Sequence, residues 1–202
     1  MKVIKQQDIK IGELIGELKL GKVIVYPTET CYGLGCDATN KGAVEKLFKI
    51  KQRQQSKPVL VLVDSVDNIN KYVNWTPTLQ SLAQKYWPGP LTVVADLNPG
   101  ISLPEGVVGP DNSLAFRITS HSFASKICSA LGVPLVSTSA NITAHKSPYD
   151  MESVMNMFGD CKYKPDIVID SGDLPHHQPS TVARVSGDKI TVLRQGELVL
   201  NI

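Results

Sequence analysis

Three cations lie close together in the sequence, at Lys51, Arg53 and Lys57. An arginine offers phosphate oxygens a planar fork of N–H donors, and a lysine supplies a compact charge. The wider segment 41–57 holds six basic residues and one acid, so it carries +5 while the rest of the chain carries −3, against an overall charge of +2. This concentration indicates either a solvated helix face or a site for a polyanion, such as a triphosphate or RNA.

Two short segments combine hydroxyl groups with small residues. Residues 27–35 (PTETCYGLG) and 137–141 (STSAN) each follow a predicted strand. Ligands of α/β sheets bind at strand ends, and so many polar side chains need a ligand, water or backbone as partner. An ordinary turn is the alternative for the first segment, and a helix cap is the alternative for the second. Residues 179–182 (PSTV) and 193–196 (LRQG) are further polar segments.

The composition indicates a soluble globular protein. Of the 202 residues, 42% are hydrophobic and 20% are charged, which excludes disordered, collagen-like and membrane proteins. No apolar run reaches the roughly 18 residues that a membrane helix needs, and no signal peptide opens the chain, so a cytoplasmic location is expected. The four cysteines lack a C-x-x-C pair and are expected to be reduced, and no bound metal is predicted. The pair His176-His177 is interpreted as surface loop.

Hydrophobic periodicity predicts alternating helices and strands. Helices are expected from an Asp8 cap to Gly21, after Asn40, and at 78–86, 120–131 and 151–158. Strands are expected at 23–25, 59–63, 91–95, 113–119, 135–136 and 167–170, followed by a hairpin of 181–185 and 189–193. Because a tight hairpin turn joins antiparallel strands, the sheet must be mixed. We therefore predict one α/β domain over residues 1–202, with a twisted parallel and antiparallel sheet and flanking helices.

Seven motifs in order give the chain a family resemblance. They are PTETCYGLG (27–35), KxRxxxKP (51–58), YWPGPLT (86–92), SLAFR (113–117), VSTSAN (136–141), PST (179–181) and LRxG (193–196). Together they resemble the YrdC/Sua5 family, the threonylcarbamoyl-AMP synthases of tRNA modification, and in particular its short bacterial-type members. The resemblance spans about residues 22–196 and implies a YrdC-like fold.

The resemblance also implies a reaction. L-Threonine, bicarbonate and ATP would give threonylcarbamoyl-AMP and pyrophosphate, for N6-threonylcarbamoyladenosine at position 37 of tRNA. The carbamate of threonine is itself an anionic nucleophile toward the α-phosphate, so no Ser, Cys or His nucleophile is required. Catalysis would then consist of positioning the reactants and neutralising phosphate charge. A threonylcarbamoyl transferase would be the downstream partner.

The family pattern assigns roles to the matching residues. Lys51 and Arg53 would be catalytic, and Arg117 would pair with the carboxylate of threonine. The ATP-binding residues would be Arg53, Lys57, Ser139, Asn141, Ser147 and Arg194, and the threonine-binding residues would be Thr28, Thr30, Tyr32, Arg117, Ser137 and Ser180. Mg²⁺ would arrive with ATP, held by phosphates and water.

The chain departs from the family pattern at three places. Residues 142–146 (ITAHK) separate Asn141 from Ser147, Gln54 stands where a proline is common, and Leu62 stands where the longer branch has histidine. Two rival functions remain open. One is a double-stranded RNA- or tRNA-binding factor without catalysis, whose binding would weaken steeply with salt. The other is a carbamoyl-handling paralogue of hydrogenase maturation, against which the lack of an acylphosphatase or zinc-finger segment counts.

Overall fold

A computed structural model describes residues 1–201, so Ile202, the last residue of the predicted domain, lies outside the described residues. Its strands are β1 (Lys2–Lys5), β2 (Ile24–Pro27), β3 (Tyr32–Gly35), β4 (Leu60–Val63), β5 (Leu91–Asp96), β6 (Ser113–Ile118), β7 (Leu135–Ser139), β8 (Ile167–Asp170), β9 (Thr181–Ser186) and β10 (Lys189–Arg194). Its helices are the 3₁₀ turn η1 (Gln6–Asp8) and α1 (Ile11–Lys19), α2 (Lys41–Lys51), α3 (Val66–Ile69), α4 (Pro77–Tyr86), α5 (Ser122–Leu131) and α6 (Met151–Phe158).

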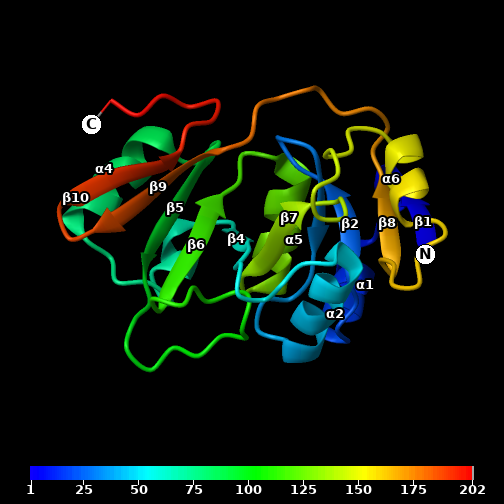
Figure 1. Cartoon of the computed structure of the whole chain (residues 1–202), viewed down its shortest axis with the longest axis horizontal. Helices are drawn as coiled ribbons and strands as arrows, with labels where there is room; N and C mark the ends of the chain where they lie inside the picture. Colours follow the sequence, from blue (N-terminus) through cyan, green and yellow to red (C-terminus); the bar gives the residue numbers. More distant parts are fainter. Residues whose placement is uncertain (202) are drawn as a thin grey trace.

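The strands form one sheet in the order β1-β8-β2-β3-β7-β4-β6-β5-β9-β10 (Figure 1). The pairs β1/β8, β8/β2, β4/β6 and β5/β9 are parallel, and the other neighbours are antiparallel. The predicted α/β fold with a mixed sheet is therefore confirmed. The predicted C-terminal hairpin is β9 and β10, in which Lys189 pairs with Ser186.

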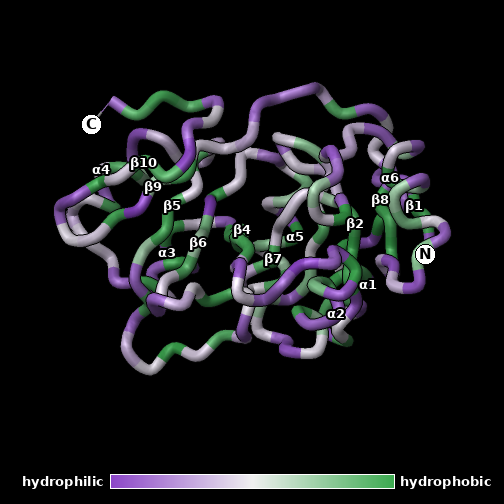
Figure 2. Tube along the Cα trace, viewed as in Figure 1, coloured by the Kyte–Doolittle hydropathy of each residue, from purple (hydrophilic) through white to green (hydrophobic). Residues whose placement is uncertain are grey.

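Apolar side chains pack on both sides of the sheet. In β2, Ile24 and Tyr26 belong to one core cluster with α1 and α5, whereas Val25 belongs to the other cluster with α2. This alternation follows from the period of two in a strand. Figure 2 shows the hydrophobic residues concentrated on the strands and the hydrophilic ones on the connecting loops.

Several predicted boundaries were wrong. Asp8 lies in η1 and caps no α-helix, because α1 begins at Ile11 after Lys10, which makes no side-chain cap. Asn40 does cap α2, accepting a hydrogen bond from the Ala43 amide at 3.1 Å. Residues 137–139 were expected in a loop, but they continue strand β7. Strands β1 and β3 and the four-residue helix α3 were not predicted.

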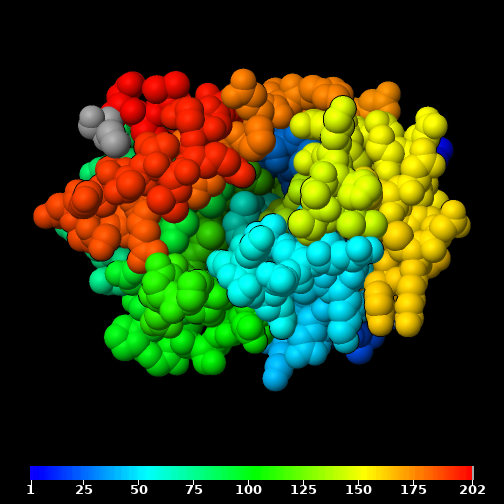
Figure 3. All heavy atoms as spheres, viewed as in Figure 1, coloured from blue at the N-terminus to red at the C-terminus, as the bar shows by residue number. Residues whose placement is uncertain are grey.

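Four segments that are distant in the sequence meet on one face of the molecule. Figure 3 shows a hollow there, ringed by segments coloured cyan, yellow-green, orange and red. These colours correspond to the region after α2, the segment after β7, the connection 171–180 between β8 and β9, and the C-terminal strands.

Candidate active site

A cavity of about 370 Å³ occupies this hollow. Seven strands that are consecutive in the sheet contribute to its lining: β3, β7, β4, β6, β5, β9 and β10. The β2–β3 connection and residues within 53–59, 147–149 and 177–180 complete it. Among the described residues, the charged side chains of its lining are Arg53, Arg117 and Arg194. His177 also lines it, and the described lining contains no Asp or Glu. Hydroxyl groups supply most of the remaining polarity, from Thr28, Thr30, Thr92, Ser137, Thr138, Ser139, Ser147, Tyr149 and Ser180. The cavity suits a polar anionic ligand.

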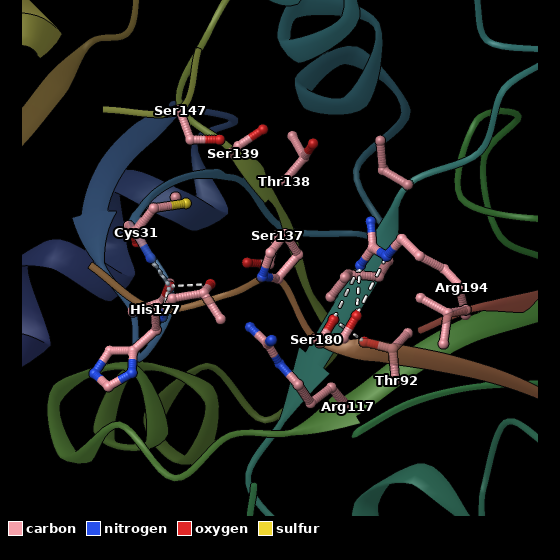
Figure 4. Close-up of a pocket in the computed structure, with 18 of the residues that line it drawn as sticks. Cys31, Thr92, Arg117, Ser137, Thr138, Ser139, Ser147, His177, Ser180 and Arg194 are labelled. Atoms are coloured by element: carbon pink, nitrogen blue, oxygen red, sulfur yellow. Dashed lines mark hydrogen bonds between the residues drawn. The ribbon is translucent and has the colours of Figure 1, made fainter. Parts of the chain in front are cut away.

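Arg117 is a nearly buried cation in the cavity wall. Its side chain is 4% exposed, and its Nε lies 3.4 Å from Glu29 Oε1. Strand β6 places Arg117 on the same side as Ala115, two residues earlier, which also lines the cavity. Figure 4 shows the guanidinium group pointing into the cavity between Ser137 and Ser180. A carboxylate of a ligand would find a bidentate partner there.

A second cation lies on the other side of Ser180. Arg194 donates hydrogen bonds to the Ser180 carbonyl oxygen, at 2.8 Å from one terminal nitrogen and 3.3 Å from Nε. The Ser180 hydroxyl lies 2.9 Å from Thr92 Oγ1 (Figure 4). Burial lowers the pKa of Arg194, and the charge of Arg117 lowers it further. The two guanidinium groups therefore repel each other, and a bound anion would relieve that repulsion.

The β2–β3 connection forms a tight turn around Thr28. Thr28 Oγ1 donates to the Cys31 carbonyl oxygen at 2.7 Å and accepts from the amides of Thr30 and Cys31 at 3.2 and 3.3 Å. Within β3, a Cβ at Gly35 would lie 2.6 Å from the Val136 carbonyl oxygen, so only glycine permits this close approach to β7. The turn thus presents Thr30 to the cavity.

Lys51 does not line the cavity. Its buried ammonium donates to the carbonyl oxygens of Ser139 and Asn141, at 2.7 and 3.0 Å, and to Asn141 Oδ1 at 2.8 Å. Burial, with a contribution from the charge of Arg53, lowers the pKa of Lys51 to about 8. Lys51 therefore fixes the end of β7 and the residues that follow it, which is a different place from the one expected for a phosphate ligand.

Arg53 reaches the cavity from the turn after α2. Its Nε donates to the Lys57 carbonyl oxygen at 2.8 Å, and a terminal nitrogen donates to the Pro58 carbonyl oxygen at 3.2 Å. These bonds fix the base of the guanidinium while it lines the cavity. Lys57 itself is exposed and outside the lining.

The unusual segment 142–146 folds back on Asn141. The Asn141 side-chain amide donates to the His145 carbonyl oxygen, and Asn141 Oδ1 accepts from Ser139 Oγ at 2.6 Å. Asn141 is buried and lies outside the lining, whereas Ser147 lines the cavity. The extra residues thus leave Ser147 at the cavity.

Most of the predicted site residues meet at the cavity. The structure brings together Thr28, Thr30, Arg53, Arg117, Ser137, Ser139, Ser147, Ser180 and Arg194. It places Tyr32, Lys51, Lys57 and Asn141 outside the lining. The Tyr32 hydroxyl instead donates to the Gly172 carbonyl oxygen at 2.7 Å and accepts from the Ser171 amide at 2.9 Å. The roles predicted for all of these residues stay predictions.

Sequence reasoning assigned no site role to four cavity residues with a hydroxyl or imidazole group: Thr92, Thr138, Tyr149 and His177. Thr92 closes the motif YWPGPLT and could have been chosen from it, because its hydroxyl is the partner of Ser180. Tyr149 and His177 gave no comparable signal. His176 and His177 are exposed and lie in a loop, as interpreted; His176 stacks on Tyr149, with ring centroids 3.9 Å apart, and His177 also lines the cavity.

Within residues 1–201, no three His, Cys, Asp or Glu side chains gather in a way that could hold a metal ion. The four cysteines are free thiols. Among the helices that the structure describes, none has the length and apolar character to cross a membrane.

The family model of Sua5/YciO/YrdC proteins, described as telomere recombination, matches residues 17–196. The chain belongs to this family. Two relatives of this Sua5/YciO/YrdC member are named threonylcarbamoyl-AMP synthase. The protein of Marinobacter nauticus is 39% identical over 142 residues, covering 69% of this chain and 74% of its own. The protein of Thiobacillus denitrificans is 34% identical over 174 residues, covering 86% of this chain and 89% of its own.

Solved structures of the Sua5/YciO/YrdC family share the fold. Sua5 of P. abyssi complexed with L-threonine superposes with a TM-score of 0.87 at 29% identity, covering 98% of this chain and 58% of its own. This chain therefore spans less than two thirds of that Sua5. YciO of E. coli superposes with a TM-score of 0.82 at 23% identity, covering 97% of this chain and 95% of its own. At this identity the likeness concerns the fold alone. The resemblance drawn from the motifs is confirmed.

Proposed function

We propose that this family member is an L-threonylcarbamoyladenylate synthase, which forms threonylcarbamoyl-AMP and pyrophosphate from L-threonine, bicarbonate and ATP. The observation that carries the proposal is the cavity with three arginines, many hydroxyl groups and no carboxylate in its described lining. Every proposed reactant presents negative charge there: the carboxylate of threonine, bicarbonate and the phosphates. The names of the relatives and the threonine complex of Sua5 support the same reaction.

On the threonine side, Arg117 would bind the substrate carboxylate through its terminal nitrogens. Ser137 and Ser180 flank its guanidinium group in Figure 4, and Thr30 lines the same cavity. These hydroxyls would bind the remaining polar groups of threonine. Thr28 would act indirectly by shaping the turn that presents Thr30. Tyr32 would act indirectly too, through its hydrogen bonds to residues 171–172.

On the nucleotide side, Arg53 and Arg194 would neutralise the phosphates of ATP, and Ser139 and Ser147 would donate hydrogen bonds to them. Lys57, exposed beside Arg53, would approach the phosphates from the cavity entrance. Lys51 and Asn141 would position Ser139 through their hydrogen bonds to it. Mg²⁺ would enter with ATP, held by phosphate oxygens and water.

The chemical step needs no nucleophile from the protein. The neutral amine of threonine adds to CO₂ formed from bicarbonate and gives a carbamate; the proton that the amine loses and the hydroxide that bicarbonate loses leave together as water. A carbamate oxygen then attacks the α-phosphorus of ATP, the bond to the β-phosphate breaks, and pyrophosphate leaves. The arginines stabilise the negative charge that gathers around the α-phosphate and on the leaving group. The product would pass to a threonylcarbamoyl transferase that acts on tRNA, and a cytoplasmic location stays a prediction.

The test is pyrophosphate release with ATP and with threonine and bicarbonate added or omitted. The proposal expects release only when all three reactants are present, and labelled carbon from bicarbonate in the AMP adduct. Release that is independent of threonine would contradict it. The rival RNA-binding function predicts instead a tRNA affinity that falls steeply with salt and does not depend on threonine.

The structure weakens one argument for the rival function, the cluster of basic residues at 41–57. On α2, Lys46 is already paired with Asp166 at 2.6 Å, so fewer free cations face solvent than the sequence indicated.

A further inference from the structure

Among the residues described, Glu29 is the one acid within ion-pair distance of an arginine of the cavity wall. Its Oε1 lies 3.4 Å from Arg117 Nε, and its side chain is 15% exposed. Glu29 does not line the cavity itself, whereas Arg117 does. The carboxylate thus contacts the inner end of the guanidinium and leaves the outer nitrogens to the cavity.

A chain of hydrogen bonds fixes the Glu29 carboxylate. The His121 amide donates to Thr119 Oγ1 at 3.1 Å, and Thr119 Oγ1 donates to Glu29 Oε2 at 2.8 Å. A threonine hydroxyl has one proton to donate and lone pairs to accept, so Thr119 can accept from His121 and donate to Glu29 at the same time. The basic side chains near Glu29 are Arg117 and His121. Burial lowers the pKa of His121, and the charge of Glu29 only partly offsets this. Arg117 is left as the permanent cation that Glu29 faces.

The contact between Glu29 and Arg117 is close but incomplete. Glu29 Oε1 and Arg117 Nε are both buried and make no hydrogen bond, although they are an obvious pair. A small rotation of either group would bring them from 3.4 Å to hydrogen-bond distance. A ligand carboxylate would bind the outer nitrogens in the plane of the guanidinium, and Glu29 would hold the Nε edge of the same plane.

We propose that Glu29 is a positioning residue for threonine, which holds the inner edge of Arg117 so that the outer nitrogens face the substrate carboxylate. The inference rests on the proposed function. Glu29 acts through Arg117, because its own oxygens are buried or bonded to Thr119. Without its charge, the guanidinium would be buried without a counterion and free to turn away from the substrate.

The test is the steady-state kinetics of Glu29→Gln, which keeps the shape of the side chain and removes its charge. The KM for threonine should rise about tenfold, while the KM for ATP and kcat stay within about twofold. L-Threoninol, which lacks the carboxylate, should inhibit the variant and the wild type equally. In an Arg117→Ala background, Glu29→Gln should cause no further rise in the KM for threonine.

A matched control is Asp166→Asn. Asp166 is a similarly buried acid, with a side chain 18% exposed and a partner in Lys46 at 2.6 Å, but it lies outside the cavity lining. Its loss should lower stability and leave the KM for threonine unchanged. If Glu29→Gln does not fold, Glu29→Asp and Thr119→Val weaken the same chain of contacts and should show the same selective rise.

Three outcomes would overturn the inference. An unchanged KM for threonine in folded Glu29→Gln would show that Arg117 needs no positioning. An equal rise in the KM for threonine and ATP, or altered inhibition by threoninol, would show a merely structural role. A wild-type protein that releases pyrophosphate without needing threonine would refute the proposed function, and the inference with it, whereas the first two outcomes leave the proposed function intact.

Discussion

At the scale of single residues, the cavity is built from cations whose inner sides are already engaged. Arg53, Arg117 and Arg194 each use part of the guanidinium on the protein, through the Pro58 and Lys57 carbonyl oxygens, Glu29, and Ser180. A cation held in this way is preorganised, so it loses little freedom when an anion binds. The three arginines therefore act as fixed positive charges.

Arg53→Ala tests this view on the nucleotide side. The substitution should lower the rate of threonine-dependent pyrophosphate release by about 10²-fold, the typical effect of removing one preorganised charge from a transition state. Folding should persist, because Arg53 contributes only two hydrogen bonds from a partly exposed turn. Circular dichroism checks the fold, and a variant that retains full activity would remove Arg53 from the phosphate site.

Lys51 gives a prediction about stability and pH. Its pKa is about 8 in the folded protein against 10.5 ordinarily, so between these values the folded protein binds fewer protons than the unfolded chain. The free energy of unfolding of the wild type should therefore rise across this pH range relative to Lys51→Arg, which stays charged, by about 3 kcal/mol. Well below pH 8 the difference should be constant.

Urea denaturation at several pH values measures this difference. Lys49→Arg, an exposed position on the same helix, is the matched control and should follow the wild type. Parallel stability curves for the wild type and Lys51→Arg would show that the four acceptor oxygens around Lys51 offset its burial.

At the scale of elements, the sequence revealed the long amphipathic helices and the buried strands, and it missed elements without a hydrophobic pattern. Strand β3 reads YGLG, and its Gly35 permits a close approach to Val136 of β7 instead of packing a side chain. Strand β1 lies at the edge of the sheet with three of four residues exposed. Such segments are set by their partners in the sheet, which a local pattern does not contain.

In the candidate site, too, features within a local motif were predictable and features set by distant partners were not. Its motifs were recognised because they are local, and nine of the predicted residues line the cavity. The orientation of Lys51 and Tyr32 was not predictable, because each bonds to a segment about 90 or 140 positions away. Residues 137–139 were expected after a strand end, yet they lie within β7, where alternation directs Ser137 and Ser139 to the same side.

Tyr32→Phe tests the role of the connection 171–180. The Tyr32 hydroxyl ties β3 to the beginning of this connection, and Ser180 at its other end lines the cavity. Loss of both hydrogen bonds should lower the free energy of unfolding by about 1–2 kcal/mol and raise the KM for threonine several-fold. Tyr163→Phe, an exposed tyrosine, is the control and should change neither quantity. Lower stability with an unchanged KM would separate the connection from threonine binding.

At the scale of the whole molecule, the cavity exists only in the folded protein. Its lining extends from Thr28 to Arg194 and across seven neighbouring strands, so an unfolded chain offers no comparable site. A ligand that binds only the folded form stabilises it by an amount set by its concentration relative to Kd. Thermal unfolding thus reports binding without requiring turnover.

ATP and threonine should each raise the melting temperature, and at about 100 times Kd each increment should be about 5–10 °C. Because the proposed function assigns Arg117 to threonine and Arg53 to ATP, Arg117→Ala should abolish the threonine increment and spare that of ATP, and Arg53→Ala should do the reverse. Arg184→Ala, which breaks a pair with Asp96 of 2.9 Å outside the cavity, should lower the melting temperature and keep both increments. Loss of both increments in Arg117→Ala would mean that the two ligands share one cationic site, and the division of the cavity into a threonine side and a nucleotide side would be wrong.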